Sequence, residues 1–548
     1  MTTINGEHSP LLDGKPVKRL PPYASTSQVV IGCLGILTFI VLSFVYPLAG
    51  DWKVSRAAGS VSMIAFFWIS ELIEIGVASM LPIALFPLLN LANVKDIASL
   101  YFSATAFLFV GGYTLAMGLQ RWNLHKRISL FAVKAVGGKP VLVTITVSFI
   151  CFILSAFMSN TATCLSVLPN AVIILKTLDP TGKDDVITKK YGKLLLLVVA
   201  WSCSIGGTLT LIGSATNLSL GIVLEKSFPK IPREVIPDFA TWTSFALPYA
   251  FILFIGLNFS FLSASRAAQK SMVVDEKTCA EEGRKEESNQ IDGFGKQLAE
   301  LGPMSFEEKV IAIAFSITAV LWATRTSYFG FGKGWQSFLT HPELFNDAVP
   351  AIIVCLILFF IPAKKQPPSG TEDKYVRIIN WGTVKTIPLD LVFLFGCGLA
   401  MSEVFESSGL SNFMAEKLKL FENLPLPVLI YCICQLTSFI SEVCSNTSTS
   451  LTLLPIVASL SKSIGVHPLY LMVPATLSCS NSYMLISATP PNSIVFASRH
   501  VVGLQVSDMA KRGIWLSILG NLALTVYSYF FLPFFYGFDP NVVPDWAH

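Results

Sequence analysis

Long apolar runs separated by short polar segments dominate the chain from about residue 28 to residue 535. A run of about 18 or more apolar residues is long enough to cross the hydrocarbon core of a bilayer as a helix. The pattern predicts an all-α polytopic membrane protein with about 11 transmembrane helices. The expected spans are roughly 28–49, 57–74, 76–95, 103–121, 193–225, 242–262, 307–324, 348–362, 387–405, 467–497 and 513–535.

Two further apolar stretches, 140–176 and 427–461, carry a polar Ser-Asn-Thr triplet in their middle. The triplets begin SNTATCLSVLP at Ser159 and SNTSTSLTLLP at Ser445. We expect the Leu-Pro pair that ends each motif, at 168–169 and 454–455, to interrupt the arm after the triplet, because proline cannot donate a helical hydrogen bond. These features predict two re-entrant hairpins. The alternative is that each stretch forms a pair of full spans. That arrangement would put every loop on the same side of the membrane as the hairpin arrangement does.

Composition agrees with a membrane protein. Of the 548 residues, 53% are hydrophobic and 14% are charged, whereas soluble domains carry about 25% charged residues. The net charge of +4 gives no indication of a nucleic-acid partner. The cysteines lie mostly inside apolar runs and the six histidines are scattered, so no disulfide framework or metal-ligand spacing is apparent. Without a catalytic Ser-Lys pair or a His/Glu metal motif, an enzyme is not expected.

The positions of lysine and arginine set the expected orientation. With a cytosolic N-terminus, about 28 of the 39 Lys and Arg residues fall in cytosolic segments, as the positive-inside rule requires. This places the tail 1–27 and the charged linker 263–305 in the cytosol, and the tail 536–548 outside. EHSPLL at Glu7–Leu12 has the spacing of a dileucine sorting signal. The plasma membrane is the expected location, and an endosomal, lysosomal or vacuolar membrane is the alternative.

The two halves of the chain resemble each other. After a first transmembrane segment at 28–56, residues 57–262 and 306–535 share matches in the same order. Asn160 matches Asn446, and SCS at Ser202 and Ser478 leads in each half to SATN or SATPPN. Such ordered matches indicate an internal duplication. An odd number of spans in each half turns the second copy upside down, and this inverted repeat is a common plan of secondary transporters.

Four breaks in apolar helices are therefore expected, at the two triplets and at the two Ser-Ala-Thr segments. A break exposes backbone polar groups, which the bilayer tolerates only where protein or a wet cavity covers them. Freed carbonyls together with Ser, Thr and Asn oxygens suit a cation such as Na⁺, whereas helix N-termini suit a carboxylate. The four broken segments contain no Lys or Arg. Bound cations would have to supply the charge that an anionic substrate needs.

Acidic residues within apolar runs are further candidates. Glu71 and Glu74 lie near a span boundary, which favours snorkelling or helix pairing over ion binding. Glu442 lies three residues before the second triplet. We expect it to form a structural hydrogen bond to the hairpin backbone, and tuning of a cation site is the alternative. Arg121–Lys139 is expected to form an amphipathic interfacial segment.

The motifs SNTATCLSVLP, SNTSTSLTLLP, IGSATNL, ATPPNSIVF and RWNLHKRISL resemble those of the divalent anion:sodium symporter family, which includes animal sodium-coupled citrate and dicarboxylate transporters. The resemblance covers nearly the whole chain from about residue 28. It implies a homodimer in the lipid bilayer, two re-entrant hairpins, and a transport domain that moves like an elevator against a scaffold domain.

The resemblance also implies particular ligands for two Na⁺ ions and a carboxylate. The first cation site would use Ser155, Ser159, Asn160 and Gly213; the second would use Ser441, the Cys444 carbonyl, Asn446 and the Ala488 carbonyl. Substrate carboxylates would meet Asn160, Thr161, Asn446, Thr447, Thr489 and Pro490. The chain departs from the family pattern at SELIEIG (70–76), at Ser441, where threonine is expected, and at Cys444. Substrate preference and cation affinity are the properties that these departures leave open.

The leading hypothesis from the sequence is Na⁺-coupled symport of succinate, malate or citrate. A Na⁺-independent exchanger and a sulfate carrier are alternatives within the same family. An anion channel is an alternative from a different class, because channels also contain hairpins and broken helices.

Overall fold

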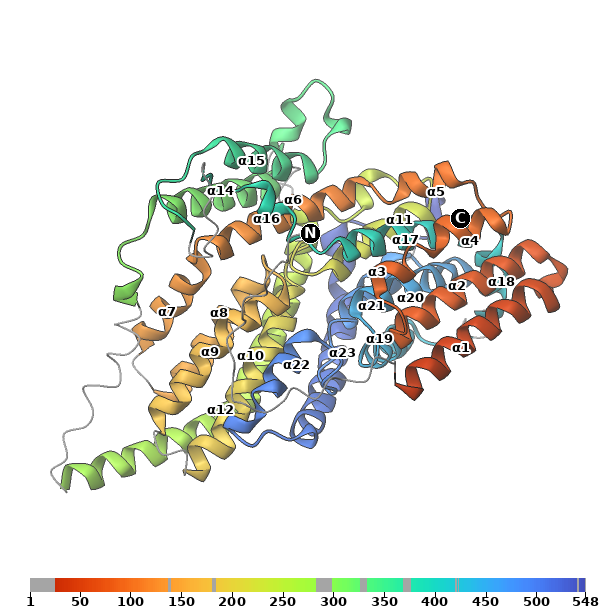
Figure 1. Ribbon diagram of the computed structural model, residues 1–548. Helices are drawn as coiled ribbons and strands as arrows, with labels where there is room; N and C mark the ends of the chain where they lie inside the picture. Colours follow the sequence, from red (N-terminus) through yellow and green to blue (C-terminus); the bar gives the residue numbers. More distant parts are fainter. Residues whose placement is uncertain are drawn as a thin grey trace, which may run out of the picture.

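The computed structural model describes residues 25–136, 139–179, 184–281, 298–325, 333–367, 376–418, 421, 423–539 and 542–547. Within these residues the secondary structure is helical, apart from one isolated antiparallel bridge between Pro362 and Arg377. The all-α expectation is confirmed. Figure 1 shows the helices packed in a single body.

The first half contains the helices that precede the linker. They are α1 (Thr26–Ile40, continued by a π-helical turn at Val41–Val45), α2 (Trp52–Ser70), α3 (Ile75–Ala78), α4 (Leu81–Leu88), α5 (Val94–Leu100), α6 (Ala104–Arg121), α7 (Leu124–Val136), α8 (Pro140–Ser155), α9 (Asn160–Leu178), a π-helical segment at Asp185–Tyr191, α10 (Gly192–Gly207), α11 (Ala215–Ser227) and α12 (Phe239–Glu281).

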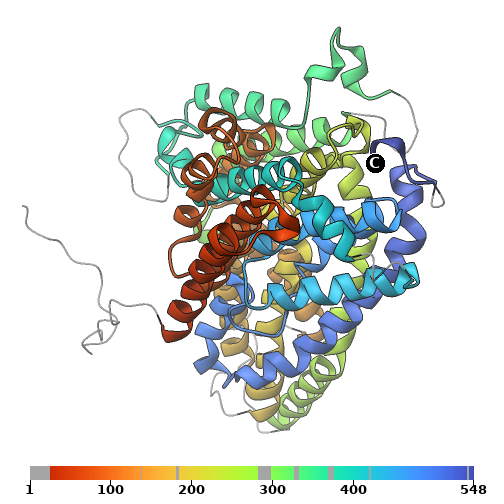
Figure 2. The same ribbon diagram turned by 90° about the vertical axis from the view of Figure 1, so that its right-hand side faces the viewer.

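The second half follows the same order of long, short and broken helices. Its members are α14 (Phe306–Ala323), α15 (Ala348–Phe360), α16 (Trp381–Val384), α17 (Leu389–Ser407), α18 (Leu410–Leu418), α19 (Leu426–Ser441), α20 (Asn446–Ile464), α21 (Leu469–Ser478), α22 (Pro490–Ala497) and α23 (Val506–Tyr536). Figure 2 shows the N-terminal helices, in red, beside helices of the second half, and α2 packs against α17, α18 and α20.

Because several helices are broken, few segments are long enough to cross a membrane as one continuous helix. Among the described residues, four segments are long and apolar enough to do so: Thr26–Val45, Val94–Arg121, Arg233–Ser271 and Val506–Tyr536. Other expected spans are divided. The span expected at 193–225 is α10 followed by α11, and the span at 467–497 is α21 followed by α22. Each divided span has to be covered by its neighbours, because its backbone groups are exposed at the break.

The expected interruptions at the two Leu-Pro pairs are wrong. Helix α9 continues through Pro169 and helix α20 continues through Pro455, so that each is 19 residues long. A proline removes one backbone hydrogen bond, but in a membrane protein packing neighbours and local adjustments of the backbone can accommodate that loss. The hairpin arms after the triplets are therefore longer than those before them, which have 16 residues each.

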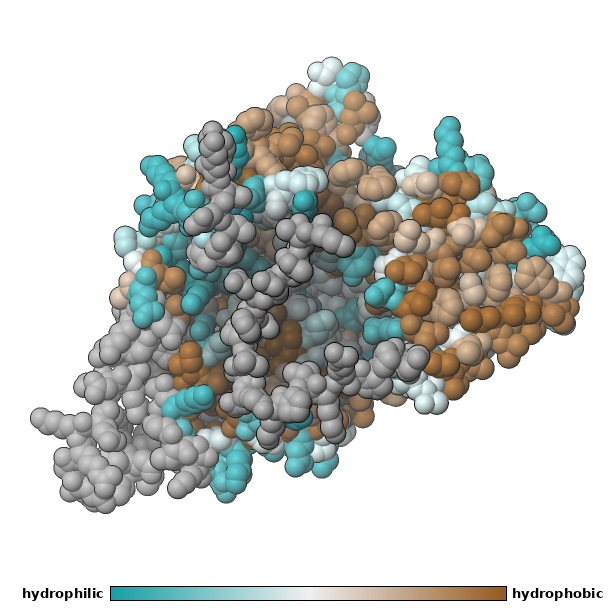
Figure 3. Space-filling view, in the orientation of Figure 1, coloured by the Kyte–Doolittle hydropathy of each residue, from teal (hydrophilic) through white to brown (hydrophobic). Residues whose placement is uncertain are grey.

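Apolar side chains cover the outer face of the N-terminal helices. Figure 3 shows hydrophobic residues gathered over the α1–α2 end of the molecule. The exposed side chains of α1 include Val30, Leu34 and Leu37. A water-soluble protein rarely exposes so large an apolar patch, so this face is suited to lipid.

Candidate functional site

The helix breaks lie at residues 156–159 and 442–445 in the hairpins, and at 208–214 and 479–489 in the divided spans. The hairpin arm α9 packs against α10 and α22, whereas α20 packs against α11 and α21. Each hairpin therefore contacts one broken helix of its own half and one of the other half. Segments that are far apart in the sequence meet at the breaks.

At the first triplet, a serine and an asparagine are joined across the turn. Ser155 donates its hydroxyl to the amide oxygen of Asn160 at 2.6 Å. Gly207, the last residue of α10, lies directly against this pair. A Cβ at Gly207 would collide with Asn160 Oδ1. Ser159 caps α9 by accepting the Ala162 N–H at 3.2 Å. Ser159, which the resemblance places at the first cation site, therefore also caps a helix N-terminus.

Gly213 lies among backbone carbonyls of the first hairpin and of α10. A Cβ built on it would be 2.7 Å from Gly207 O, 3.0 Å from Ala156 O and 3.1 Å from Ser155 O. Only a residue without a side chain fits so close to three carbonyl oxygens. These oxygens come from the same two breaks as the Ser155–Asn160 pair. Such oxygen ligands are the kind that Na⁺ takes in discontinuous transporter helices, so the residues fit the first expected cation site.

The second triplet repeats this arrangement. Ser441 donates to Asn446 Oδ1 at 2.6 Å, the same distance as in the first half. A second hydroxyl, from Ser482 in the 479–489 break, donates to the same amide oxygen at 3.2 Å. Cys444 lies buried in the turn of this hairpin, and Ala488 lies in the break that contains Ser482. The residues expected at the second site thus come from the hairpin and from the break between α21 and α22. Ser482, which was not expected from the sequence, lies with them.

Glu442 joins these two segments. Its carboxylate accepts the backbone N–H of Met484 at 3.0 and 3.1 Å and that of Leu485 at 2.8 Å. The expected bond to the backbone of its own hairpin is therefore corrected: the partners lie in the 479–489 break. A carboxylate satisfies freed N–H groups that the bilayer cannot. Glu442 fixes the break in position beside Ser441 and Asn446.

Two buried asparagines, Asn217 and Asn492, brace the divided spans. Asn217 donates its amide to Gly207 O at 2.8 Å and to Thr210 O at 2.7 Å, and Asn492 donates to Leu485 O at 2.9 Å. The oxygen of each amide is buried without a hydrogen-bond partner within the described part of the chain. Both residues stand at the ends of the SATN and SATPPN motifs, and no role was expected for them from the sequence. Their equivalent places in the two repeats were the available signal.

The expected substrate residues are only partly brought together. A cavity of about 780 Å³ is lined by Ser159 and Thr161 from the first hairpin and by Pro490 at the start of α22. Thr447 lies elsewhere, with its hydroxyl 3.2 Å from that of Thr216 on α11. Thr489 is buried and caps α22 by accepting the Asn492 N–H. Asn160, Asn446, Thr447 and Thr489 are not among the residues that line this cavity.

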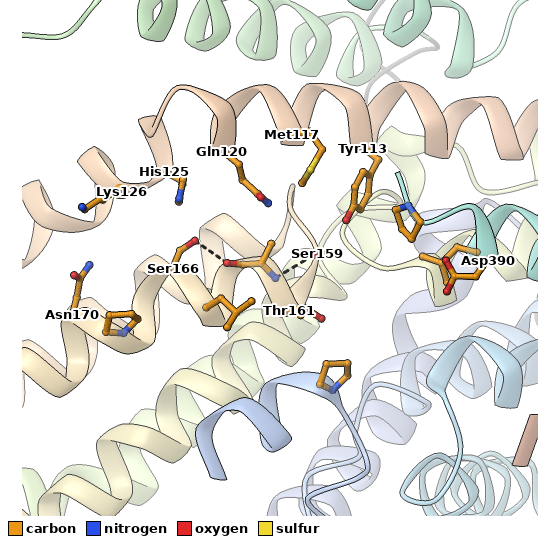
Figure 4. Close-up of a pocket in the computed structure, with 16 residues that line it drawn as sticks. Tyr113, Met117, Gln120, His125, Lys126, Ser159, Thr161, Ser166, Asn170 and Asp390 are labelled. Carbon is orange, nitrogen blue, oxygen red and sulfur yellow. Dashed lines mark hydrogen bonds between the residues drawn. The ribbon is translucent and has the colours of Figure 1, made fainter. Parts of the chain in front are cut away.

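The same cavity also has charged walls. Figure 4 shows His125 and Lys126 on one side of Ser159 and Asp390 on the other. The broken segments themselves contain no Lys or Arg, as the sequence shows, but α7 brings one lysine to the cavity. Tyr113 and Gln120 of α6 complete the wall opposite the first hairpin.

Comparison with known proteins agrees with this architecture. The family model described as "Sodium:sulfate symporter transmembrane region" matches residues 33–535. The chain is 31% identical to rabbit (Oryctolagus cuniculus) solute carrier family 13 member 2, over 92% of this chain and 93% of the relative. It is 31% identical to the sodium-dependent dicarboxylate transporter SdcS of Staphylococcus aureus (strain MRSA252), over 96% of this chain and 95% of the relative.

Two solved structures share the fold at lower identity. They are MtrF of Neisseria gonorrhoeae, described as one of a class of antimetabolite efflux pumps (TM-score 0.52, 13% identity, covering 90% of this chain and 96% of that chain), and the YdaH transporter of Alcanivorax borkumensis (TM-score 0.53, 13% identity, covering 92% and 98%). A match over residues 33–535, together with helix breaks at both triplets, leads to one conclusion. This chain belongs to the divalent anion:sodium symporter family and is a membrane transporter, not an enzyme.

Proposed function

We propose that this chain is a Na⁺-coupled symporter of di- and tricarboxylates such as succinate, malate and citrate. The observation that carries the proposal is the repeated pair at the two hairpin breaks, in which Ser155 and Ser441 each donate to an asparagine oxygen at 2.6 Å. The names of the relatives support the coupling ion and the substrate class, since SdcS is a sodium-dependent dicarboxylate transporter.

The proposed order of events follows from charge. Each site offers neutral oxygens: one serine hydroxyl, one asparagine amide and nearby carbonyls. Two Na⁺ ions bound there as cargo would provide positive charge next to the cavity. A dianion could then enter without the penalty of burying an uncompensated charge. Each asparagine has two roles in this scheme. Its Oδ1 faces the cation, and its Nδ2 would donate to a substrate carboxylate once the hairpin tips shift, because neither asparagine lines the cavity in this structure.

Helix N-termini provide the second attraction for the anion. α9 begins at Asn160 and α22 begins at Pro490, and residues of both starts line the cavity. Free N–H groups and the helix dipole favour a carboxylate at such a place. Thr161 and Pro490 would contact it there. Thr447 and Thr489, which the cavity does not expose, would contact it only after the hairpins and broken helices shift.

We further propose an elevator-type movement within a homodimer, with the two hairpins and the divided spans as the moving part. α17 lies where such a part would meet the scaffold, because α11 and α20 both contact it. Lys226 of α11 pairs with Glu403 at 2.8 Å, and Lys462 of α20 pairs with Glu406 at 3.0 Å. The cytosolic N-terminus and the plasma membrane location stay predictions. EHSPLL at Glu7–Leu12 lies outside the described residues.

Uptake of radiolabelled succinate into proteoliposomes tests the proposal. An inward Na⁺ gradient should drive accumulation, and replacing Na⁺ with choline should abolish it. Counterflow driven by internal citrate without Na⁺ would instead identify an exchanger. Competition by sulfate stronger than that by succinate and citrate would identify a sulfate carrier, and currents far above carrier turnover would identify a channel. The oligomeric state of the purified protein, measured by mass photometry, tests the homodimer.

A further inference from the structure

A second crevice, far in sequence from the hairpin tips, lies between α12 and α23. Its volume is about 410 Å³. α12 contributes residues spaced by one turn, Leu253, Gly256 and Ser260, and α23 contributes Leu516 and Gly520 among others. The full set of lining residues also includes Trp201, Ile252, Phe261, Lys511, Arg512, Trp515, Leu519 and Ala523.

Two glycines shape the crevice between the two helices. A Cβ built on Gly256 would meet no atom within 4 Å, so the space beside this residue is open. A Cβ on Gly520 would lie 3.2 Å from Leu253 Cδ2, which shows that the helices approach each other there. The floor is Trp201, which is 1% exposed, whereas Trp515 and Leu519 on the rim are 63% and 57% exposed. The crevice is therefore an apolar groove with exposed apolar side chains on its rim, which suits a surface in contact with lipid.

One end of the groove is basic. Arg512 lies over the ring of Phe261 at 5.9 Å, and Lys511 is its neighbour. Neither forms an ion pair within the described part of the chain. Asp508, four residues before Arg512, pairs with Lys193 at 2.8 Å and also interacts electrostatically with Arg512 at longer range. Two cations thus remain at the end of an otherwise apolar groove.

The floor supplies an unpaired donor. The Trp201 indole N–H is buried and has no hydrogen-bond partner among the residues described, although its ring packs against Phe261 and Tyr483. A buried donor without a partner costs about 1–3 kcal/mol.

We propose that this groove binds one anionic glycerophospholipid, with its phosphate at Lys511 and Arg512 and one acyl chain along Gly256 and Gly520. The eleven-residue step from Arg512 to Ala523 covers roughly 16 Å of helix, about the depth of one leaflet of a 30 Å hydrocarbon core. Charge at one end and an apolar stem of this length complement an anionic lipid better than a free phosphate or an uncharged detergent. α12 packs against α8 and α10, and α23 packs against α19 and α21, so the lipid would lie beside the hairpins and divided spans that are proposed to move.

Native mass spectrometry of the purified full chain tests this site. The probe is an equal mixture of dioleoyl phosphatidylglycerol and dioleoyl phosphatidylcholine. We expect one phosphatidylglycerol per protomer to be retained in preference to phosphatidylcholine. Lys511→Ala combined with Arg512→Ala should weaken its retention by about tenfold or more. Gly256→Leu should also displace it, because the new side chain would grow into the open space beside Gly256.

The matched control removes the same charge from another surface. Lys189 and Lys190 are exposed side chains of the Asp185–Tyr191 segment, and the Lys189→Ala, Lys190→Ala double variant should retain the lipid. Equal loss in this control, or equal retention of the two lipids by the wild type, would reduce the site to nonspecific charge or adventitious binding and overturn the proposal. Retention by Gly256→Leu, with its melting temperature unchanged, would overturn the acyl groove. None of these readouts depends on transport.

Discussion

The Ser441 hydroxyl donates to Asn446 Oδ1 at 2.6 Å across the turn of the second hairpin. Ser155 and Asn160 have the same separation in the sequence and the same hydrogen-bond distance in the first hairpin. In each pair, the two oxygens lie close enough together to coordinate one cation jointly. The equivalence indicates that the two halves build their sites by the same local rule, although their surroundings differ.

Removing the hydroxyl should weaken Na⁺ activation. Ser441→Ala deletes one oxygen of the pair, and we expect the Na⁺ concentration for half-maximal succinate uptake to rise by about tenfold or more. Ser441→Thr keeps the hydroxyl and should retain most of the affinity. Ser316→Ala is the control, because that hydroxyl lies on an exposed face of α14 and donates to Ala312 O within its own helix. An unchanged Na⁺ dependence in Ser441→Ala would place the second cation elsewhere.

The two asparagines should be indispensable. Asn160→Ala and Asn446→Ala each remove the amide oxygen for the cation and the amide N–H₂ for the anion, so uptake should fall to background while surface expression is retained. Expression is measured by surface biotinylation. Normal transport by either variant would show that its hairpin tip does not form part of the site.

A methyl group at Gly207 should disturb the first site specifically. The new Cβ would collide with Asn160 Oδ1, so Gly207→Ala should displace the amide and strongly reduce Na⁺-dependent uptake. Gly221→Ala on α11 is the matched control, since its nearest neighbour would be Ile236 Cγ2 at 3.5 Å, an ordinary contact. Similar uptake by the two variants would contradict the tight fit of α10 against the first hairpin.

Glu442 should act by positioning the break at 479–489. Glu442→Gln leaves one acceptor oxygen for three N–H···O contacts and brings an amide donor toward backbone donors. A hydrogen bond to a charged group contributes about 1.5–3 kcal/mol, so both the melting temperature and the Na⁺ affinity should fall. Glu442→Asp, which keeps the charge on a shorter side chain, should be less damaging. A changed maximal rate with unchanged Na⁺ affinity would contradict a role beside the second cation site.

A buried ion network should matter for folding but not for coupling. Arg325 contacts Asp347 at 2.5 Å and Asp238 at 3.1 Å, and these side chains are at most 12% exposed. Breaking a buried pair on one side costs about 3–5 kcal/mol, so Asp347→Ala should lower the melting temperature clearly. Lys189→Ala, which breaks an exposed pair with Asp185, should change it little. Differential scanning fluorimetry in detergent measures both. The Na⁺ dependence of the surviving Asp347→Ala protein should equal that of the wild type.

The sequence by itself determined the helical class, the position of the four breaks and the Ser–Asn spacing of the two tips. These features are local. A long apolar run indicates a segment that lies in lipid, and a polar triplet within it indicates a break in the helix. Pro169 and Pro455 show the limit of local reasoning. Proline weakens a helix in isolation, yet both helices continue, because packing against neighbours decides whether a lost hydrogen bond can be tolerated.

Only the tertiary structure decided which groups meet. It placed Ser482 on the amide oxygen of Asn446, directed Glu442 to the backbone of another segment, and brought Lys126 of α7 into the cavity of the first hairpin. It also opened the crevice between α12 and α23. None of these partners is close in the chain. The residue type fixes which bonds a side chain can make, but contacts between helices that are remote in the chain fix which of those bonds form.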